Sequence, residues 1–376
     1  MDFKQVAKDF PIKQKMIYLN NASIGACSNR VKNAVDDFLT QVVESGRNNY
    51  PTWCKIAENE VKADIGKLLG AQKDEIAFIK NTTEGLVFVA NGVDWKPGDN
   101  MLIAEMEYPS NVYCWLNLKR LGVEIRWIKN RGGKIAIDDV VALVDSRTRV
   151  ISLSGVQFSN GFKLDLERVG DICKKNNVIF NLDMIQWWGA VDFDASKYNI
   201  DFASGGGHKW LLGPIGTGIF YCRRSSLEKI RVSSLGYHSI DKSEDHLDYD
   251  LTAFRPGAAR FEEALVNFPG IWGLHAAVKT MLDLGMKNVE AHITKLDELA
   301  IDGLKKKGYK IISHRDPSER SGILSFNHPT VAPEQIVDRL QKANVHLAIR
   351  ASGLRISPSI FNDEHDIAAL IAALPQ

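Results

Sequence analysis

The amino-acid sequence predicts an α/β protein with a mostly parallel central sheet flanked by helices, followed by a smaller α+β domain. Through the first half of the chain, short runs rich in β-branched and aromatic residues alternate with amphipathic helical patterns. The runs "VISLS" and "VIFNL" are almost continuously apolar, as in strands that are buried on both faces. The rhythm changes near residue 255, where the loop-like "FRPGAARFEE" precedes a long helical pattern.

The predicted elements follow this rhythm in order. The patterns predict strands at 75–80, 100–105, 124–128, 149–154 and 178–183, with helices at 82–93, 111–122 and 165–176 between them. In the last third, residues 288–308 carry a helical apolar stripe made of Val289, Ile293, Leu296, Ala300 and Leu304. Strands at 322–326, 345–350 and 353–357 and a helix from Asp363 complete the chain. We therefore expect a large domain at 16–254 and a small domain made of 1–15 and 255–376.

Net charge, cysteine pattern and the distribution of apolar residues indicate which kinds of binding partner and which cellular location to expect. The formal net charge of +1 leaves no electrostatic footprint for nucleic acid or an anionic membrane, which favours a small-molecule ligand. The five cysteines are scattered without a C-x-x-C pair or a nearby histidine, so we expect reduced thiols and no metal site. We find no signal-peptide pattern and no apolar run long enough to span a bilayer, which predicts a cytoplasmic protein.

Three short motifs carry candidate chemistry. Asp183 ends the apolar strand of "NLDMIQWWG", at the sheet edge where ligands bind in open α/β folds. Lys209 follows three glycines and His208 and precedes Trp210, a setting that can desolvate its amine and lower its pKa. In "NTTEGL", Asn81 can cap a helix whose free N–H groups and positive dipole end would suit a phosphate.

Each motif also has a structural reading. Asp183 could cap the next helix or form a salt bridge, Lys209 could be a partly buried stem with a solvated head, and Asn81 could do no more than cap. Taken together, a phosphate cradle, a strand-end carboxylate and a later glycine-flanked lysine are the parts that hold pyridoxal 5'-phosphate (PLP). A Rossmann-type nucleotide enzyme is excluded because no G-x-G-x-x-G follows the first strand.

The ordered motifs resemble one family along nearly the whole chain. "YLNNAS", "NTTEG", "EMEYPSN", "NLDMIQWWGAVDFD", "GGGHKWLLGPIGTG", "ARFEEALVN" and "GLRISPSIFND" occur in the order found there. The chain resembles the class V aminotransferase superfamily of fold-type I PLP-dependent enzymes, which includes cysteine desulfurases, selenocysteine lyases and isopenicillin N epimerase-like proteins. The resemblance implies a homodimer with active sites at the subunit interface.

The resemblance also implies roles for individual residues. Lys209 would form the Schiff base with PLP and move the proton at the substrate Cα. The implied cofactor-binding residues are Thr82, Thr83, Tyr108, Gln157, Asp183, Gln186 and His208, with Asp183 at the ring nitrogen, Gln186 at the ring hydroxyl oxygen and Tyr108 over the ring. Arg355 would grip the substrate α-carboxylate, and the further substrate-binding candidates are Arg350, Asn20 and Asn21.

Two departures from the family pattern bear on the reaction. Desulfurases carry a catalytic cysteine between the two arginines, and here that interval is "RASGLR" with no cysteine. The phosphate-binding Ser or Thr that relatives supply from the neighbouring subunit is Leu265 here, and the usual Ser before the lysine is Gly206, so Asn267, His208 or Ser204 would have to replace those donors.

We therefore predict an enzyme that binds a free α-amino acid as an external aldimine and removes its Cα proton. β- or γ-Elimination, as in a C–S or related lyase, is our preferred reaction, with epimerisation and transamination as alternatives. An alternative of another class is a non-catalytic sulfur-transfer scaffold or cofactor-sensing protein on the same fold.

Overall fold

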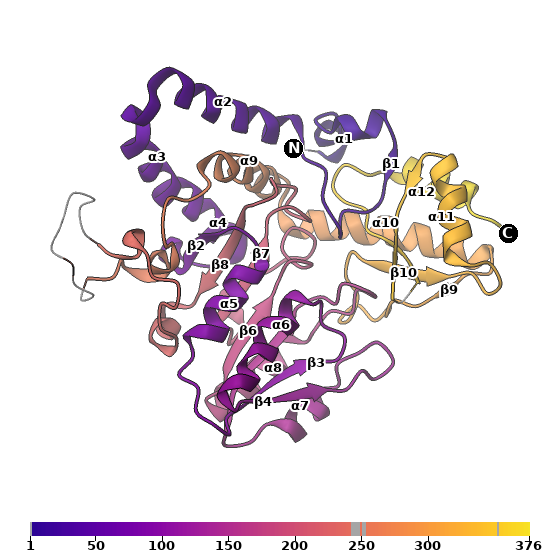
Figure 1. Ribbon diagram of the computed structural model, residues 1–376. Coiled ribbons are helices and arrows are strands. Elements are labelled where there is room, and N and C mark those ends of the chain that lie inside the picture. Colours follow the sequence, from indigo (N-terminus) through magenta and orange to yellow (C-terminus); the bar gives the residue numbers. More distant parts are fainter. Residues whose placement is uncertain (1, 242–248, 250–252, 352) are drawn as a thin grey trace.

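The chain folds around a large twisted sheet with helices on both faces, seen in the computed structural model (Figure 1). The structure describes residues 2–241, 249, 253–351 and 353–376. Within these residues the large sheet has seven strands in the order β2-β8-β7-β6-β5-β3-β4. Their bounds are Ile76–Ile79 (β2), Asn100–Ala104 (β3), Glu124–Ile128 (β4), Thr148–Ser154 (β5), Ile179–Asp183 (β6), Phe202–Gly206 (β7) and Gly218–Cys222 (β8).

The expectation of a mostly parallel sheet is confirmed. The strands β4, β3, β5, β6 and β7 pair in parallel, while β8 runs antiparallel to both of its neighbours, β7 and β2. The parallel strands therefore place their carboxyl ends along one edge, where Asp183 ends β6.

Successive side chains of a strand point to opposite faces of the sheet and so contribute to two hydrophobic cores, one on each face. In β2, Ile76 and Phe78 belong to one core, and Ala77 and Ile79 belong to the other. The first core includes residues of α2 (Asn29–Ser45), α3 (Tyr50–Ile56), α4 (Lys62–Leu69), α8 (Leu166–Asn176) and α9 (Phe268–Leu284). The second includes residues of α5 (Thr82–Gly92) and α6 (Ser110–Leu116). Helix α7 (Ile137–Leu143) lies near β4 and α8.

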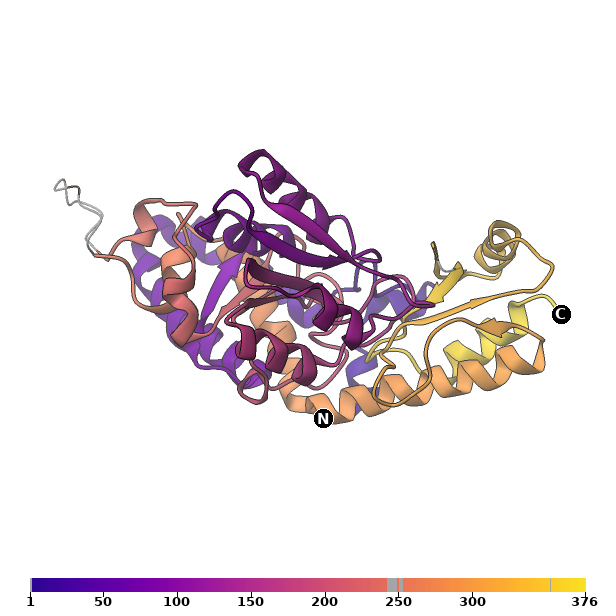
Figure 2. The same cartoon turned by 90° about the horizontal axis from the view of Figure 1, so that it is seen from below.

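The C-terminal part builds a second, smaller sheet. Strands β9 (Lys310–Ile311), β10 (Leu324–Asn327), β12 (Ala348–Arg350) and β13 (Gly353–Ile356) form an antiparallel sheet in the order β12-β13-β10-β9. Its core involves α10 (Met286–Lys306), α11 (Pro333–Lys342) and α12 (Glu364–Ala373). All five residues of the predicted apolar stripe on α10 are buried, and this helix runs from the large sheet to beneath the small one (Figure 2).

The N-terminal segment joins the two parts. After α1 (Phe3–Ala7), strand β1 (Ile17–Tyr18) pairs in parallel with β11 (Val345–His346), and α9 packs along α2. The predicted domain boundaries after residues 15 and 254 stay a prediction, although these contacts cross both of them. Within the described residues, none of the helices combines the length and the apolar character that a membrane span needs.

Candidate functional site

Lys209 lies in the loop that follows β7, and its side chain is enclosed. The residue is 9% exposed, and its Nζ atom lies 5.5 Å from the centre of the Tyr108 ring. The backbone of Gly25 comes so close that a Cβ there would lie 2.0 Å from the Lys209 carbonyl oxygen, which requires glycine at this position. Burial lowers the Lys209 pKa to about 8; the Asp183 carboxylate opposes this shift, and the charges of Arg355 and Arg350 add to it.

Asp183 is a buried carboxylate at the carboxyl end of β6. It is 2% exposed, and its Oδ1 atom accepts a hydrogen bond of 3.0 Å from the Ile185 N–H. Burial raises its pKa to about 7, and the nearby Glu107 carboxylate contributes in the same direction, while the Ile185 hydrogen bond and Lys209 lower it. A positive group bound beside Asp183 would stabilise its ionised form.

Glu107, which the sequence analysis did not single out, is the centre of a hydrogen-bond network close to Asp183. Its carboxylate accepts hydrogen bonds from the Ser154 N–H (2.9 Å) and hydroxyl (2.5 Å), from Asn111 (2.9 Å) and from Gln157 Nε2 (2.9 Å). Burial raises the pKa of Glu107 despite these four donors. Because Glu107 takes the NH₂ group of Gln157, the buried Gln157 Oε1 atom is left with no partner.

The predicted helix N-terminus lies at the start of α5, and its role as a phosphate site stays a prediction. Asn81 caps this helix by accepting from the Glu84 N–H, as expected, whereas the Glu84 carboxylate accepts from Lys80 rather than closing a capping box onto Asn81. Thr82 is buried, and its Oγ1 atom accepts from the Gly206 N–H at 2.9 Å, which leaves its own hydrogen free for another acceptor. Thr83 is exposed beside it.

Two other predicted cofactor residues, His208 and Gln186, lie in the same segments as Lys209 and Asp183. His208 is half-buried, and burial together with the Lys209 charge lowers its pKa. Gln186 is 3% exposed; its Nε2 atom donates to the Ala22 carbonyl (3.0 Å), and its Oε1 atom accepts from Trp210 Nε1 (2.8 Å). Trp210, expected to exclude water, therefore also fixes the orientation of the Gln186 amide.

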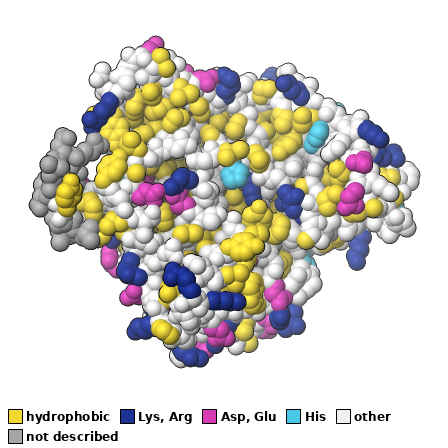
Figure 3. Space-filling view, viewed as in Figure 1, with side chains coloured by type: hydrophobic (Ala, Val, Ile, Leu, Met, Phe, Trp, Pro, Cys, Tyr) yellow, Lys and Arg dark blue, Asp and Glu magenta, His cyan; other side chains and the backbone are white. Residues whose placement is uncertain are grey.

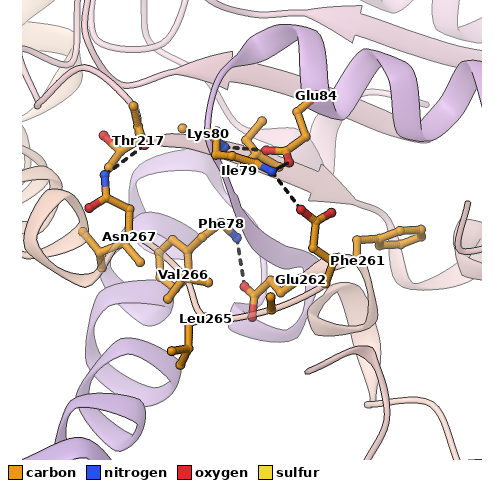
Figure 4. A pocket seen from close by; sticks show the side chains of 15 residues that line it. Phe78, Ile79, Lys80, Glu84, Thr217, Phe261, Glu262, Leu265, Val266 and Asn267 are labelled. Atoms are coloured by element: carbon orange, nitrogen blue, oxygen red, sulfur yellow. Dashed lines mark hydrogen bonds and ion pairs between the residues drawn. The ribbon is translucent and has the colours of Figure 1, made fainter. Parts of the chain in front are cut away.

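Asn267 lies in a separate pocket between the end of β2 and the start of β8 (Figure 4). Its Oδ1 atom caps α9 by accepting from the Gly270 N–H, and its Nδ2 atom donates to the Gly216 carbonyl. Leu265 lines the same pocket and is 59% exposed. The role of Asn267 as a replacement phosphate donor stays a prediction.

The candidate substrate residues meet where the N-terminal turn reaches β12 and β13. Arg355 is 1% exposed and donates to the Phe158 carbonyl, to Asn20 Oδ1 and to Ser23 Oγ. Arg350 donates to the same Ser23 oxygen. Asn21 is fully buried and donates to the Ser357 carbonyl, while its own Oδ1 atom lacks a partner. Burial lowers the Arg355 pKa to about 9, and the charge of Arg350 adds to this effect.

Within the described residues, neither Arg350 nor Arg355 forms an ion pair with a carboxylate. The arrangement therefore offers two guanidinium groups to an anion, next to an enclosed lysine. No group of three or more His, Cys, Asp or Glu side chains suited to a metal occurs in the described part of the chain.

These residues fit PLP. A buried lysine with a lowered pKa, a buried strand-end carboxylate that gains from a positive partner, and a helix N-terminus with a free threonine hydrogen match the aldehyde, the ring nitrogen and the phosphate of this cofactor. The partnerless Gln157 oxygen adds a buried acceptor near the same strand ends.

Comparisons with known proteins identify the family and the fold. The family model described as "Aminotransferase class-V" matches residues 17–370. A protein named "Probable cysteine desulfurase" from Methanothermobacter thermautotrophicus is 28% identical, over 98% of this chain and 96% of its own. The apo structure of a cysteine desulfurase from Thermococcus onnurineus superposes with a TM-score of 0.88 at 22% identity, covering 98% of this chain and 96% of that one.

A cystine C–S lyase, solved in complex with its reaction product cysteine persulfide, is also similar in structure. Its TM-score is 0.89 at 22% identity, over 96% of this chain and 98% of that one. The match of the family model along nearly the whole sequence shows that this chain belongs to the class V aminotransferase family of PLP-dependent enzymes.

Proposed function

We propose that this enzyme catalyses β- or γ-elimination on a free α-amino acid, as a C–S or related lyase. The observation that carries the proposal is Lys209, an enclosed amine with a pKa of about 8 beside two arginines that have no carboxylate partner within the described residues. An amine with a pKa of about 8 is roughly 10–20% neutral near physiological pH, so it can accept a proton and return it.

The residues divide the work as follows. Lys209 would hold PLP and then take the Cα proton of the substrate, Asp183 would keep the ring nitrogen protonated, and Thr82 and Thr83 would hold the phosphate. When bound, PLP supplies an electron sink for the pair left at Cα. Tyr108, which lies against the Lys209 amine, would cover the site on one side and limit access of water.

The substrate carboxylate would bind at the two arginines. Planar guanidinium groups hold a carboxylate through paired charged hydrogen bonds, and Arg355 is deeply enough buried to make such bonds strong. Asn20 and Asn21 shape the turn that faces these groups, because Asn20 contacts Arg355 and Asn21 is bonded to the end of β13.

Elimination is preferred to persulfide formation because of what the chain lacks near the arginines. The segment Arg350 to Arg355 holds no cysteine, and the described structure places the buried Cys173 on α8 and Cys222 on β8, with raised thiol pKa values. One structural neighbour is described as a cystine C–S lyase, and this supports elimination as the proposed reaction.

The test is a product assay on the PLP-loaded enzyme. We expect the purified protein to be yellow and Lys209→Ala to lose that absorption band. A screen of cysteine, cystine and other amino acids should release an α-keto acid, ammonia and the leaving group. Inverted substrate without keto acid would mean epimerisation, and transfer of the amino group would mean transamination. A wild-type protein that binds PLP but changes no amino acid would favour the sensing or scaffold alternative.

We further propose that the enzyme works as a homodimer. Leu39, Val42 and Val43 on α2 are 47%, 40% and 85% exposed, and hydrophobic side chains gather on the part of the face that α2, α3 and α9 occupy (Figure 3). Light scattering should give twice the monomer mass, and Val43→Glu should shift it toward the monomer. A monomeric wild-type protein with full activity would contradict this proposal.

A further inference from the structure

Ser23 has a hydroxyl group whose hydrogen-bonding capacity is used completely by the candidate substrate site. Its Oγ atom accepts from Arg350 Nη2 at 2.7 Å and from Arg355 Nη2 at 2.8 Å, and it donates to Asn20 Oδ1 at 2.7 Å. A serine hydroxyl has two lone pairs and one hydrogen, so these three bonds leave it neither a free acceptor nor a free donor.

The backbone holds Ser23 in this place. Residues 20–23 form a turn in which the Ser23 N–H donates to the Asn20 carbonyl, and the turn is tied to Ser357 through the Asn21 side chain and the Ala22 N–H. Ser357 directly follows β13, which carries Arg355 and pairs with β12, where Arg350 ends the strand. The position of the hydroxyl relative to both guanidinium groups is therefore set by the sheet.

Two like charges share this oxygen, and no carboxylate among the described residues forms an ion pair with either of them. The other contacts of the two groups are to neutral oxygens, the carbonyls of Ile349 and Phe158 and the Asn20 amide. The Nε atom of Arg355 is buried and has no partner. Repulsion between two guanidinium groups favours their separation, and the Ser23 oxygen is an acceptor that both of them contact.

We propose that Ser23 is a positioning residue that holds Arg350 and Arg355 together as one preformed site for the substrate α-carboxylate. This inference rests on the proposed function, because it assumes an amino-acid substrate. Ser23 acts through the arginines, and its oxygen is not available to the substrate while both bonds are made.

Removing the oxygen should weaken carboxylate binding selectively. A hydrogen bond to a charged group contributes enough that its loss corresponds to roughly a tenfold to hundredfold weaker affinity. In Ser23→Ala we expect KM for the amino acid to rise by about that factor with kcat changed less than threefold. Ser23→Thr keeps the hydroxyl and should retain most of the wild-type KM.

A spectroscopic comparison separates positioning from a general disturbance. The PLP-loaded proteins are titrated with an amino acid and with the corresponding amine that lacks the carboxylate, and the change of the visible band gives each Kd. Ser23→Ala should raise the Kd of the amino acid and leave the Kd of the amine unchanged. Ser23→Gly removes the same oxygen and repeats the test if alanine disturbs the turn.

The outcomes distinguish this inference from the proposed function. Ser23 does not position the arginines if the variants bind the amino acid with the wild-type Kd, or if their affinity for the amine falls by the same factor as their affinity for the amino acid. If the wild-type protein takes up no PLP or shows no response to any amino acid, the proposed function itself is wrong.

Discussion

The buried carboxylate of Asp183 should make the cofactor-free protein less stable as the pH rises. Its folded pKa of about 7 exceeds the ordinary value of 3.8, chiefly because of burial, so the folded protein keeps a proton that the unfolded chain loses. Stability therefore falls as the pH rises from about 4 to about 7 and stays low above that range. The full difference corresponds to about 4 kcal/mol, of which about 2–3 kcal/mol is lost between pH 5 and pH 8.

The perturbation is Asp183→Asn, which keeps the shape of the side chain and removes the ionisation. Urea unfolding of the cofactor-free proteins at pH 5 and pH 8 should show the wild type losing about 2–3 kcal/mol more than the variant across this interval. Without Asp183 the Lys209 pKa falls further, so the variant gains stability as the pH rises. This adds to the difference between wild type and variant that is expected between pH 5 and pH 8. Loading with PLP should remove most of the difference, because the ring nitrogen supplies a positive partner.

Asp297 provides a matched control on α10. It is 1% exposed, both of its carboxylate oxygens lack partners, and burial raises its pKa to about 8. Asp297→Asn should therefore reduce the fall in unfolding free energy between pH 5 and pH 8 by a similar amount. This reduction should be the same in the PLP-free and the PLP-loaded protein. Parallel pH profiles for wild type and Asp183→Asn, or relief of both sites by PLP, would refute the reasoning.

Two further variants test the surroundings of the site. Glu107→Gln brings amide hydrogens to a position where all four neighbours donate, so we expect a stability loss of about 1–3 kcal/mol by urea unfolding. It should also move the Asp183 transition to lower pH, because Glu107 raises that pKa; an unmoved transition would contradict the coupling. Gly85→Ala would place a Cβ 2.2 Å from Ser204 Oγ and should cost about 1–3 kcal/mol and weaken PLP binding. Ser204→Gly in the same chain removes the two nearest atoms and should recover part of the stability, although Phe220 Cδ2 would still lie 3.0 Å from the new Cβ. A wild-type melting curve for Gly85→Ala alone would show that the sheet yields without cost.

The sequence predicted the sheet and the main chemical groups because both leave local signals. Short apolar runs identified five strands of the large sheet, and period-3.6 patterns identified helices. Asp183 became a candidate through its place at a strand end, and Lys209 through its glycine-rich and apolar neighbours. Neither β7 nor β8 was predicted: the run of β7, "FASGG", lacks the β-branched residues typical of strands, and the run of β8 carries no sign of its antiparallel direction. The eleven residues before it, 207–217, contain no helix to carry a parallel crossover.

The missed site residues owe their roles to partners far along the chain. Ser23 meets Arg350 and Arg355 across 327 and 332 residues, and Glu107 reaches Gln157 across 50. Ser23 ends the motif "YLNNAS" and Glu107 lies in "EMEYPSN", so both belong to recognised motifs, but nothing local to either residue indicates its partners. The pairing of β1 with β11 and the order of the large sheet bring these groups together, and neither follows from local patterns.

The charges around Lys209 indicate how substrate binding would change its basicity. Burial, Arg355 and Arg350 lower its pKa, while Asp183 raises it, and the balance leaves the amine near pKa 8. A bound carboxylate would neutralise part of the positive field of the two arginines and so raise the Lys209 pKa. The lysine would then be a stronger base, but a larger fraction of it would be protonated near neutral pH, so the lowering of its pKa by burial is what keeps some of the amine neutral. An amine lacking the carboxylate would leave the field unchanged, so such a compound should bind without the same rise in the Lys209 pKa.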